Sequence, residues 1–246
     1  MAPDEEALRD AEWLRERIAN RVIPNPSPRN AMIRTESSLP DSIERGYHAD
    51  GHKTWGFVIY RTTYENDADW AECMRRLRWW AADSMEYYNG QDVLDLMTWT
   101  IFDDREQFEN MDVPTIRRHF RNWTETAVQS EQSTANMGGS PRYKYCVQID
   151  TEALKSVLGT HPPPRSDDDH AGWVKLIDKN WLPRSEDPLW AGRRPDPNEY
   201  EPIDGITDER IGWVKVPLIS VMVEYYEMFR DPNMVMRAHR RPPAIM

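Results

Sequence analysis

The sequence predicts an α+β sandwich of ferredoxin-like type, in which a mainly antiparallel sheet carries helices on one face. Three observations lead to this fold class. Segments of strand type alternate with segments of helical periodicity along the 246-residue chain. Residues 142–150 alternate apolar and polar side chains, as a strand does when one face of its sheet is covered. Hydrophobic residues make up 39% of the chain, which is enough for one substantial core.

Residues 1–50 are predicted to lie outside the core domain. Residues 4–21 are charged and carry a partial apolar stripe typical of a short helix. Three prolines, at positions 24, 26 and 28, then interrupt the pattern, so residues 22–50 are expected to form an extended arm. A single α+β domain is expected to span residues 51–246.

The domain is expected to open with a strand at 55–64, where β-branched and aromatic residues dominate. A helix follows, capped by Asn66 or Asp67 and ended by the Asn-Gly pair at 89–90, because apolar side chains recur between them at steps of three and four. The period-two pattern at 94–102 predicts the second strand.

Asp112 as a cap and Pro114 in the first turn predict the start of a second long helix. The cleanest strand pattern of the chain follows at 142–150, and residues 151–158 are expected to form a short helix.

The motif Gly-Trp-Val-Lys occurs twice, beginning at Gly172 and at Gly212. Each copy is expected to begin a strand, in which the glycine allows close backbone approach and the tryptophan covers the sheet edge. We favour this structural explanation over duplication or shared ligand binding, because true repeats extend over about 20 to 50 residues. A polar loop at about 179–210 joins the two strands. A helix beginning at Pro217 and a last strand at 233–239 complete the predicted order.

The formal net charge of −11 argues against nucleic acid and anionic membranes as partners, because the chain repels phosphate groups. The longest apolar run, at 216–223, is far shorter than the roughly 20 residues that span a bilayer. The N-terminus has no apolar stretch of signal-peptide type, so we expect a cytoplasmic protein. Cys73 and Cys146 stand in no disulfide or metal pattern and are expected to be reduced and inert.

Several phrases of the sequence resemble a large family of uncharacterised intracellular proteins from filamentous ascomycete fungi. The resemblance spans about residues 53–243 and is carried by "WGFVIYRTTY", "LDLMTWTIFDD", "HFRNW", "RYKYCVQIDTEAL", "EPIDGITDERIGWVKV" and the closing "RRPP". It implies a fungal origin and one α+β fold. It implies no activity, substrate or cofactor, so no catalytic residue is carried over.

The sequence contains none of the familiar catalytic motifs: it has no G-x-S-x-G elbow, H-E-x-x-H motif, Walker loop or G-x-G-x-x-G. We therefore expect no cofactor, and our leading hypothesis is a non-catalytic small-molecule-binding or protein-interaction module. Dimerisation through a sheet face or edge fits this hypothesis. Indoles bind flat rings and sugars, so Trp123, Trp173 and Trp213 are candidate ligand contacts.

The alternative hypothesis is a cofactor-independent isomerase, cyclase or hydrolase of secondary metabolism that uses His119 as acid or base. Arg61, within a strand, would bind an anionic group of the substrate. A deep pocket lined by both residues would favour this enzyme, and a flat aromatic patch would favour the interaction module. A third alternative, a host-directed effector exported without a signal peptide, has no positive evidence in the sequence.

Two charged segments are not expected to form a binding site. The adjacent carboxylates of Asp167, Asp168 and Asp169, followed by His170, lack the spacing of a calcium loop, so no metal site is expected. The basic segment at 237–243 is expected to fold against carboxylates of the chain, and docking of an acidic partner is the alternative.

Overall fold

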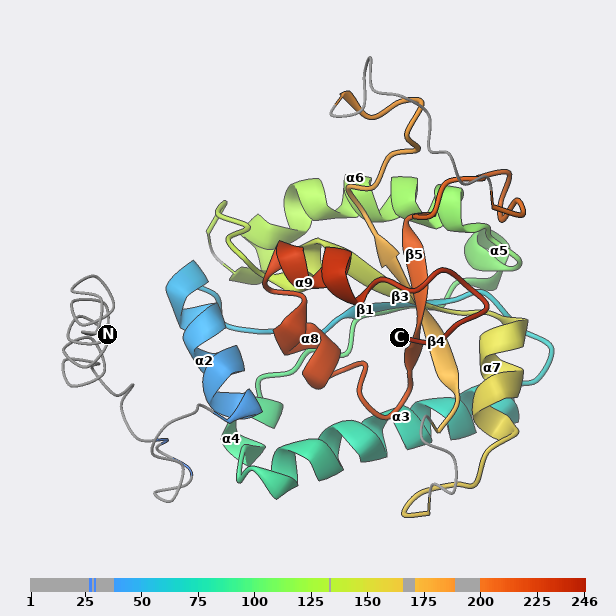
Figure 1. Cartoon of the computed structure of the whole chain (residues 1–246). Helices are drawn as coiled ribbons and strands as arrows, with labels where there is room; N and C mark the ends of the chain where they lie inside the picture. Colours follow the sequence, from blue (N-terminus) through green and yellow to red (C-terminus); the bar gives the residue numbers. More distant parts are fainter. Residues whose placement is uncertain (1–26, 28, 30–37, 133, 166–170, 189–199) are drawn as a thin grey trace, which may run out of the picture.

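The computed structural model describes residues 27, 29, 38–132, 134–165, 171–188 and 200–246. A five-stranded sheet lies between two layers of helices, with α6 on one side and α3 on the other (Figure 1). The α+β class is therefore confirmed. The predicted helix at 4–21 and the loop from Asp167 to His170 lie outside the described residues.

The sheet has the strand order β2-β1-β3-β4-β5. Its strands are β1 (Val58–Arg61), β2 (Ile101–Phe102), β3 (Tyr145–Ile149), β4 (Trp173–Asp178) and β5 (Trp213–Pro217). β1 runs parallel to β2 and β3, whereas β4 runs antiparallel to β3 and β5. The sheet is mixed, so the predicted mainly antiparallel sheet is wrong. The reason is that a long helix connects β1 to β2 and another connects β2 to β3, and such crossovers return the chain to the same end of the sheet.

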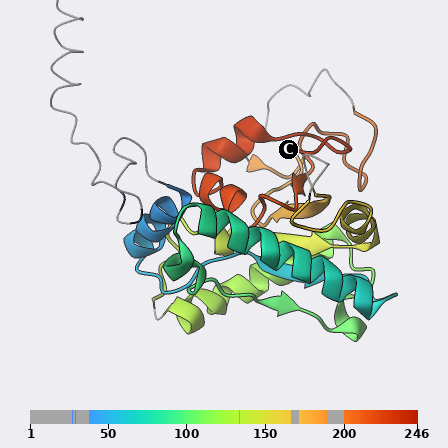
Figure 2. The same ribbon diagram turned by 90° about the horizontal axis from the view of Figure 1, so that it is seen from below.

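One face of the sheet packs on α3 (Asp67–Tyr87), α7 (Thr151–Leu158), α8 (Glu224–Met228) and α9 (Pro232–Ala238). Figure 2, seen from below, shows α3 running across this side of the molecule. The helix α3 begins where the sequence predicts, because the Asn66 side chain accepts hydrogen bonds from the backbone N–H groups of Ala68 and Asp69.

The other face packs on α5 (Arg105–Phe108) and α6 (Val113–Gln132), so the prediction of helices on one face is also wrong. The alternation of apolar and polar residues at 142–150 suggested that one face of the sheet is open to water, but the polar residues of this strand are buried as well. Cys146 is buried in the same core as Ile116 and Phe120 of α6. Gln148 is 3% exposed, and its amide group donates hydrogen bonds to Thr62 Oγ1 and Met111 O.

Residues 39–50 form a helix, α2 (Leu39–Asp50), where the sequence predicted an extended arm. Ser38 and Asp41 form a capping box, and Pro40 occupies the first turn, where a proline needs no N–H partner. Arg29 holds this part of the chain in place. Its guanidinium pairs with Asp41 at 2.6 Å and also with Asp92, which lies in α4 (Gln91–Leu94).

The structure differs from the prediction at two further places. Residues 94–102 contain only the two-residue strand β2, because the chain first forms α4. Residues 232–238 form the helix α9 instead of a last strand, since Asp231 caps it and Pro232 opens it. Ile245 forms a bridge to Lys215 on the outer edge of β5. Among the described residues, no helix is long and apolar enough to cross a bilayer.

The two Gly-Trp-Val-Lys segments lie side by side as antiparallel strands, with Lys175 directly opposite Lys215. Each lysine Nζ lies over the indole of the other segment. The distance to the ring centre is 4.7 Å from Lys175 to Trp213 and 3.6 Å from Lys215 to Trp173. Lys175 also pairs with Asp150, and Lys215 with Glu152, which offsets the repulsion between two opposite cations.

Both positions of the motif require glycine because neighbouring atoms come too close for a side chain, and the sequence predicts such a close approach. Their φ angles are +84° at Gly172 and +78° at Gly212. A Cβ on Gly172 would lie 2.4 Å from the Cα of Val157 in α7. A Cβ on Gly212 would lie 2.4 Å from Arg117 Nη2 and from the Trp181 ring. The second glycine thus positions a contact between α6 and the loop after β4.

Candidate functional site

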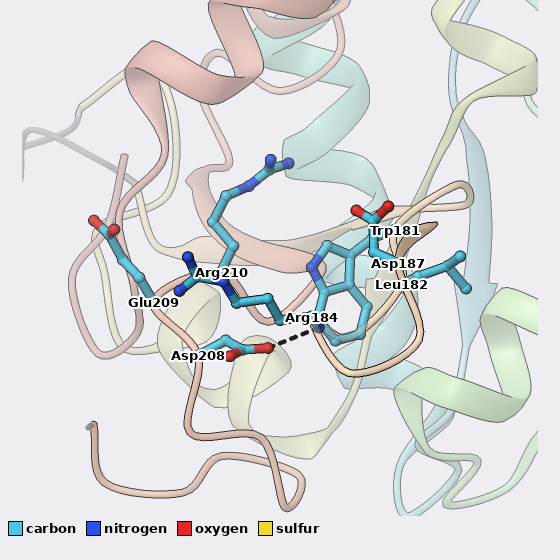
Figure 3. Close-up of a pocket in the computed structure, with 7 residues that line it drawn as sticks. All are labelled: Trp181, Leu182, Arg184, Asp187, Asp208, Glu209 and Arg210. Atoms are coloured by element: carbon cyan, nitrogen blue, oxygen red, sulfur yellow. Dashed lines mark hydrogen bonds between the residues drawn. The ribbon is translucent and has the colours of Figure 1, made fainter. Parts of the chain in front are cut away.

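Two neighbouring cavities are lined by the loops that follow β4 and precede β5, and α6 lines the larger of them. The larger one, of about 340 Å³, is here called the α6 cavity because Arg117, Arg118 and Arg121 of that helix line it. The smaller one, of about 120 Å³, is here called the Asp208 cavity and is drawn in Figure 3. Trp181 and Leu182 line both cavities, so the two cavities adjoin at these residues.

The start of α6 places its arginines at the α6 cavity. The Asp112 carboxylate accepts a hydrogen bond of 2.9 Å from the backbone N–H of Thr115, which fixes the first turn. Ile116 and Phe120 then pack on the sheet. Arg117 and Arg121 are one turn apart and therefore share the neighbouring face of the helix.

Arg117 is 7% exposed, and the hydrogen-bond acceptors of its guanidinium among the described residues are backbone carbonyl groups. Its Nε donates to Asp178 O at 2.9 Å, and its Nη2 donates to Gly212 O at 3.0 Å. The guanidinium also lies 4.8 Å from the centre of the Trp181 ring. Desolvation lowers the pKa of Arg117, yet an arginine stays charged in a protein. Nη1 makes no hydrogen bond within the described residues.

Arg121 is held in the same way, through bonds from Nε to Lys179 O at 2.5 Å and from Nη2 to Trp181 O at 3.1 Å. Arg118 is exposed and donates to Thr115 Oγ1 at 3.3 Å. Within the part of the chain that the structure describes, none of the three arginines forms an ion pair with a carboxylate. The carboxylates that line this cavity are those of Glu186 and Asp204.

The Asp208 cavity is lined by the carboxylates of Asp187, Asp208 and Glu209 and by Arg184 and Arg210. The backbone N–H of Arg184 donates to Asp208 Oδ2 at 3.0 Å, the bond dashed in Figure 3. In that view Glu209 lies on the opposite side of the cavity from Trp181, and the Arg210 guanidinium points away from Asp208.

The C-terminal basic segment supports the loop that carries Asp208. Arg241 donates to the carbonyl oxygens of Asp208, Glu201 and Ile206. The segment therefore folds against the chain. The partners that Arg241 has among the described residues are backbone carbonyls, where the sequence led us to expect carboxylates.

The structure places His119 in an aromatic box beside β1. Its Nδ1 lies 2.8 Å from Tyr60 Oη, and the ring centres of Phe102 and Phe108 are 5.0 and 5.2 Å from that of the imidazole. Desolvation lowers the pKa of His119, and burial raises the pKa of the Tyr60 hydroxyl. His119 lines neither the α6 cavity nor the Asp208 cavity.

Arg61 lies on the opposite face of the sheet from His119. Its guanidinium pairs with Asp67 and Asp103 and lies 4.4 and 5.0 Å from the ring centres of Tyr64 and Trp70. The structure therefore does not bring the two residues of the enzyme hypothesis together.

The three candidate tryptophans lie in packed surroundings. Trp123 stacks between Phe120 and Tyr143, with ring centres at 5.6 and 6.0 Å. Trp173 and Trp213 are 8% and 6% exposed. Trp213 is nevertheless connected to the α6 cavity, because its Nε1 donates to Asp204 Oδ2 at 3.0 Å.

Sequence reasoning missed the arginines of α6 and Trp181. The segment "RRHFR" does contain the signal, because two arginines separated by four positions lie on one side of a helix. What the sequence does not show is that the loops near 181 and 211 meet this helix.

Comparison of the chain with protein-family models, with curated proteins and with solved structures found no match. The proposals below therefore depend on the geometry and charges of the molecule itself.

Proposed function

We propose that the protein is a small-molecule-binding protein that takes the anionic group of its ligand in the α6 cavity. The observation that supports this proposal is the row of three arginines around a hollow of about 340 Å³, none of them ion-paired within the described residues. Ligand pockets generally occupy about 300 to 1,000 Å³, so the hollow suits a small organic molecule.

The arginines are arranged to bind an anion without moving far. Arg117 and Arg121 are each tied to two backbone carbonyls, which fixes their guanidinium groups before a ligand arrives. A guanidinium binds a carboxylate or phosphate through two parallel hydrogen bonds. Glu186 and Asp204 on the same cavity limit the negative charge that it accepts, which favours a ligand with one anionic group.

The remaining wall favours a ligand with an apolar body. The Trp181 indole, Leu182, Pro183 and Ile206 line the same cavity as the arginines. A flat ring fits against an indole, and burial of apolar surface supplies the affinity that an exposed ion pair lacks. A binding role is favoured over the enzyme alternative because His119 and Arg61 lie on opposite faces of the sheet. We retain the sequence-based expectation of a cytoplasmic protein.

A titration with 4-ethylbenzoate tests the proposal. We expect the ligand to shift the indole N–H signal of Trp181 in spectra of the ¹⁵N-labelled protein. The Arg118→Gln variant should weaken binding about fivefold, since a hydrogen bond between charged groups is worth about 1 kcal/mol when partly exposed. Arg118 is the suitable position because its side chain makes no bond to the backbone of another element.

The matched control is Arg237→Gln, which removes an exposed arginine of α9. It should leave the affinity unchanged, because it lines neither cavity. Equal affinities of the wild type and the Arg118→Gln variant, or shifts confined to residues far from Trp181, would rule the proposal out.

A further inference from the structure

We infer that the ligand carries a basic amine as well as an anionic group, and that the Asp208 cavity takes the amine. This inference rests on the proposed function, because it assumes that the α6 cavity holds the anionic group. The two cavities share Trp181 and Leu182 as their wall, so one ligand can extend past the indole from one cavity into the other.

The charges that line the two cavities have opposite balance. The α6 cavity has the three arginines 117, 118 and 121 against two carboxylates. The Asp208 cavity has three carboxylates, those of residues 187, 208 and 209, against two arginines. A ligand with an anion at one end and a cation at the other complements this arrangement, whereas a dianion would meet the three carboxylates.

Two of these carboxylates have capacity to receive an ammonium group. Asp208 Oδ2 accepts the Arg184 N–H, but Oδ1 accepts no hydrogen bond from the described residues. The Glu209 carboxylate forms no ion pair with them, although its negative charge acts on the nearby His239, whose Nε2 lies 3.2 Å from the Glu209 backbone carbonyl. An ammonium group that reached Asp208 would gain a charge-assisted hydrogen bond without displacing an existing one.

The position of Trp181 sets the shape of the ligand. An indole between the two cavities separates the anionic group from the amine, so the two groups belong at opposite ends of a flat or extended apolar body. An α-amino acid carries both groups on one carbon and does not meet this requirement. A ring with para substituents does, and its amine also gains from the electron-rich face of the indole.

Matched probes test the inference. The first probe, 4-(aminomethyl)benzoate, carries both the carboxylate and the ammonium group. In the second, 4-ethylbenzoate, a methyl group of similar size replaces the ammonium. In the third, 4-ethylbenzylamine, an ethyl group replaces the carboxylate. We expect 4-(aminomethyl)benzoate to bind the wild-type protein about tenfold more tightly than 4-ethylbenzoate. This advantage should largely disappear in Asp208→Asn, where the amide oxygen still accepts the Arg184 N–H. Glu209→Gln, at an exposed position, is the second variant and should reduce the advantage without affecting folding.

The outcomes separate the two proposals. If both acids bind equally and Arg118→Gln weakens both, the inference is wrong and the anion site stands. If neither acid binds, both proposals are wrong. If 4-ethylbenzylamine binds as tightly as 4-(aminomethyl)benzoate, both are also wrong, because the carboxylate then contributes nothing. An advantage that is unchanged in both Asp208→Asn and Glu209→Gln would likewise overturn the inference.

Discussion

Arg142 and Arg117 are both buried guanidinium groups, but they are held differently. Arg142 is 0% exposed and binds both carboxylate oxygens of Glu131, at 2.6 and 2.8 Å, as well as Gly56 O at 2.8 Å. Tyr143 Oη also donates to Glu131 at 2.8 Å. Arg142 is thus committed to an internal carboxylate. The hydrogen-bond acceptors of Arg117 among the described residues are carbonyl oxygens, and Arg117 lines the α6 cavity.

The Glu131→Gln variant should destabilise the protein by about 3 kcal/mol, because it leaves the buried Arg142 charge without its counter-ion. Urea unfolding followed by circular dichroism measures this loss. Arg105→Gln, which removes an exposed pair with Glu109 on α5, is the control and should leave the urea midpoint unchanged. A Glu131→Gln variant as stable as the wild type would contradict the assigned role.

The same residue predicts a pH dependence. Burial opposes ionisation of Glu131, but the Arg142 hydrogen bonds outweigh it, so the pKa of this carboxyl is lower in the folded protein than its ordinary value of 4.5. A depressed pKa contributes stability that is fully present above the unfolded value and is lost as the pH falls through the folded value. The free energy of unfolding should therefore decrease below about pH 4.5, and less steeply in Glu131→Gln. If the free energy of unfolding fell equally steeply with decreasing pH in the wild type and in Glu131→Gln, this role of Glu131 would be refuted.

At the scale of elements, the two Gly-Trp-Val-Lys segments form neighbouring strands, β4 and β5, but their glycines make room for different neighbours. Gly172 lets α7 approach β4, and Gly212 lets Arg117 and Trp181 approach β5. The first glycine serves packing alone. The second also supports one wall of the α6 cavity, so the two copies of the motif provide a matched pair of test positions.

Gly172→Ala and Gly212→Ala should each cost about 1 to 3 kcal/mol, because both glycines have positive φ and both new methyl groups would lie too close to neighbouring atoms. Thermal unfolding measures this cost. Only Gly212→Ala should also weaken the binding of 4-ethylbenzoate, since only there does the methyl group displace Arg117 and Trp181. The expectation fails if both variants, or neither, lose affinity at a temperature where they remain folded.

At the scale of the whole molecule, the sheet separates two cores, and each contains one cysteine. Cys73 of α3 belongs to one core and Cys146 of β3 to the other, and both are 0% exposed. Desolvation raises the pKa of both thiols, to about 12 for Cys73. A thiol-specific reagent should therefore react with neither in the native protein at neutral pH.

In low urea, both thiols should react at one common rate, because helices on both sides share the strands that would have to open. Mass spectrometry of digested, labelled samples measures each thiol separately. A much faster reaction of Cys73 than of Cys146 would show instead that the two layers open independently.

The sequence predicted the elements with strong local signals and missed those decided by distant contacts. The helix α3, the short helix α7 and the two Gly-Trp-Val-Lys strands lie where periodicity and caps indicate. The strand directions and the second helical layer depend on how α6 crosses the sheet, which no local pattern records. The helices α2 and α9 were missed because Pro40 and Pro232, which open them, were not recognised as signals of a helix start.

The candidate site was less predictable than the fold for the same reason. Its arginines come from α6, its wall from Trp181 and its carboxylates from residues 187, 208 and 209. These segments are far apart in the sequence and become neighbours only when β4 and β5 pair.

The pairing of β1 with β3 joins segments that are synthesised far apart in time. β1 pairs with β3 through contacts such as Val58 with Cys146, so almost the first half of the domain emerges from the ribosome before its middle strand exists. Pairs so distant in the chain form slowly, because a long loop must close first. During this interval the apolar side of α3, with Trp70 and Leu77, has no sheet to cover it. This apolar surface therefore stays exposed in the nascent chain until β3, which ends at Ile149, is available for pairing.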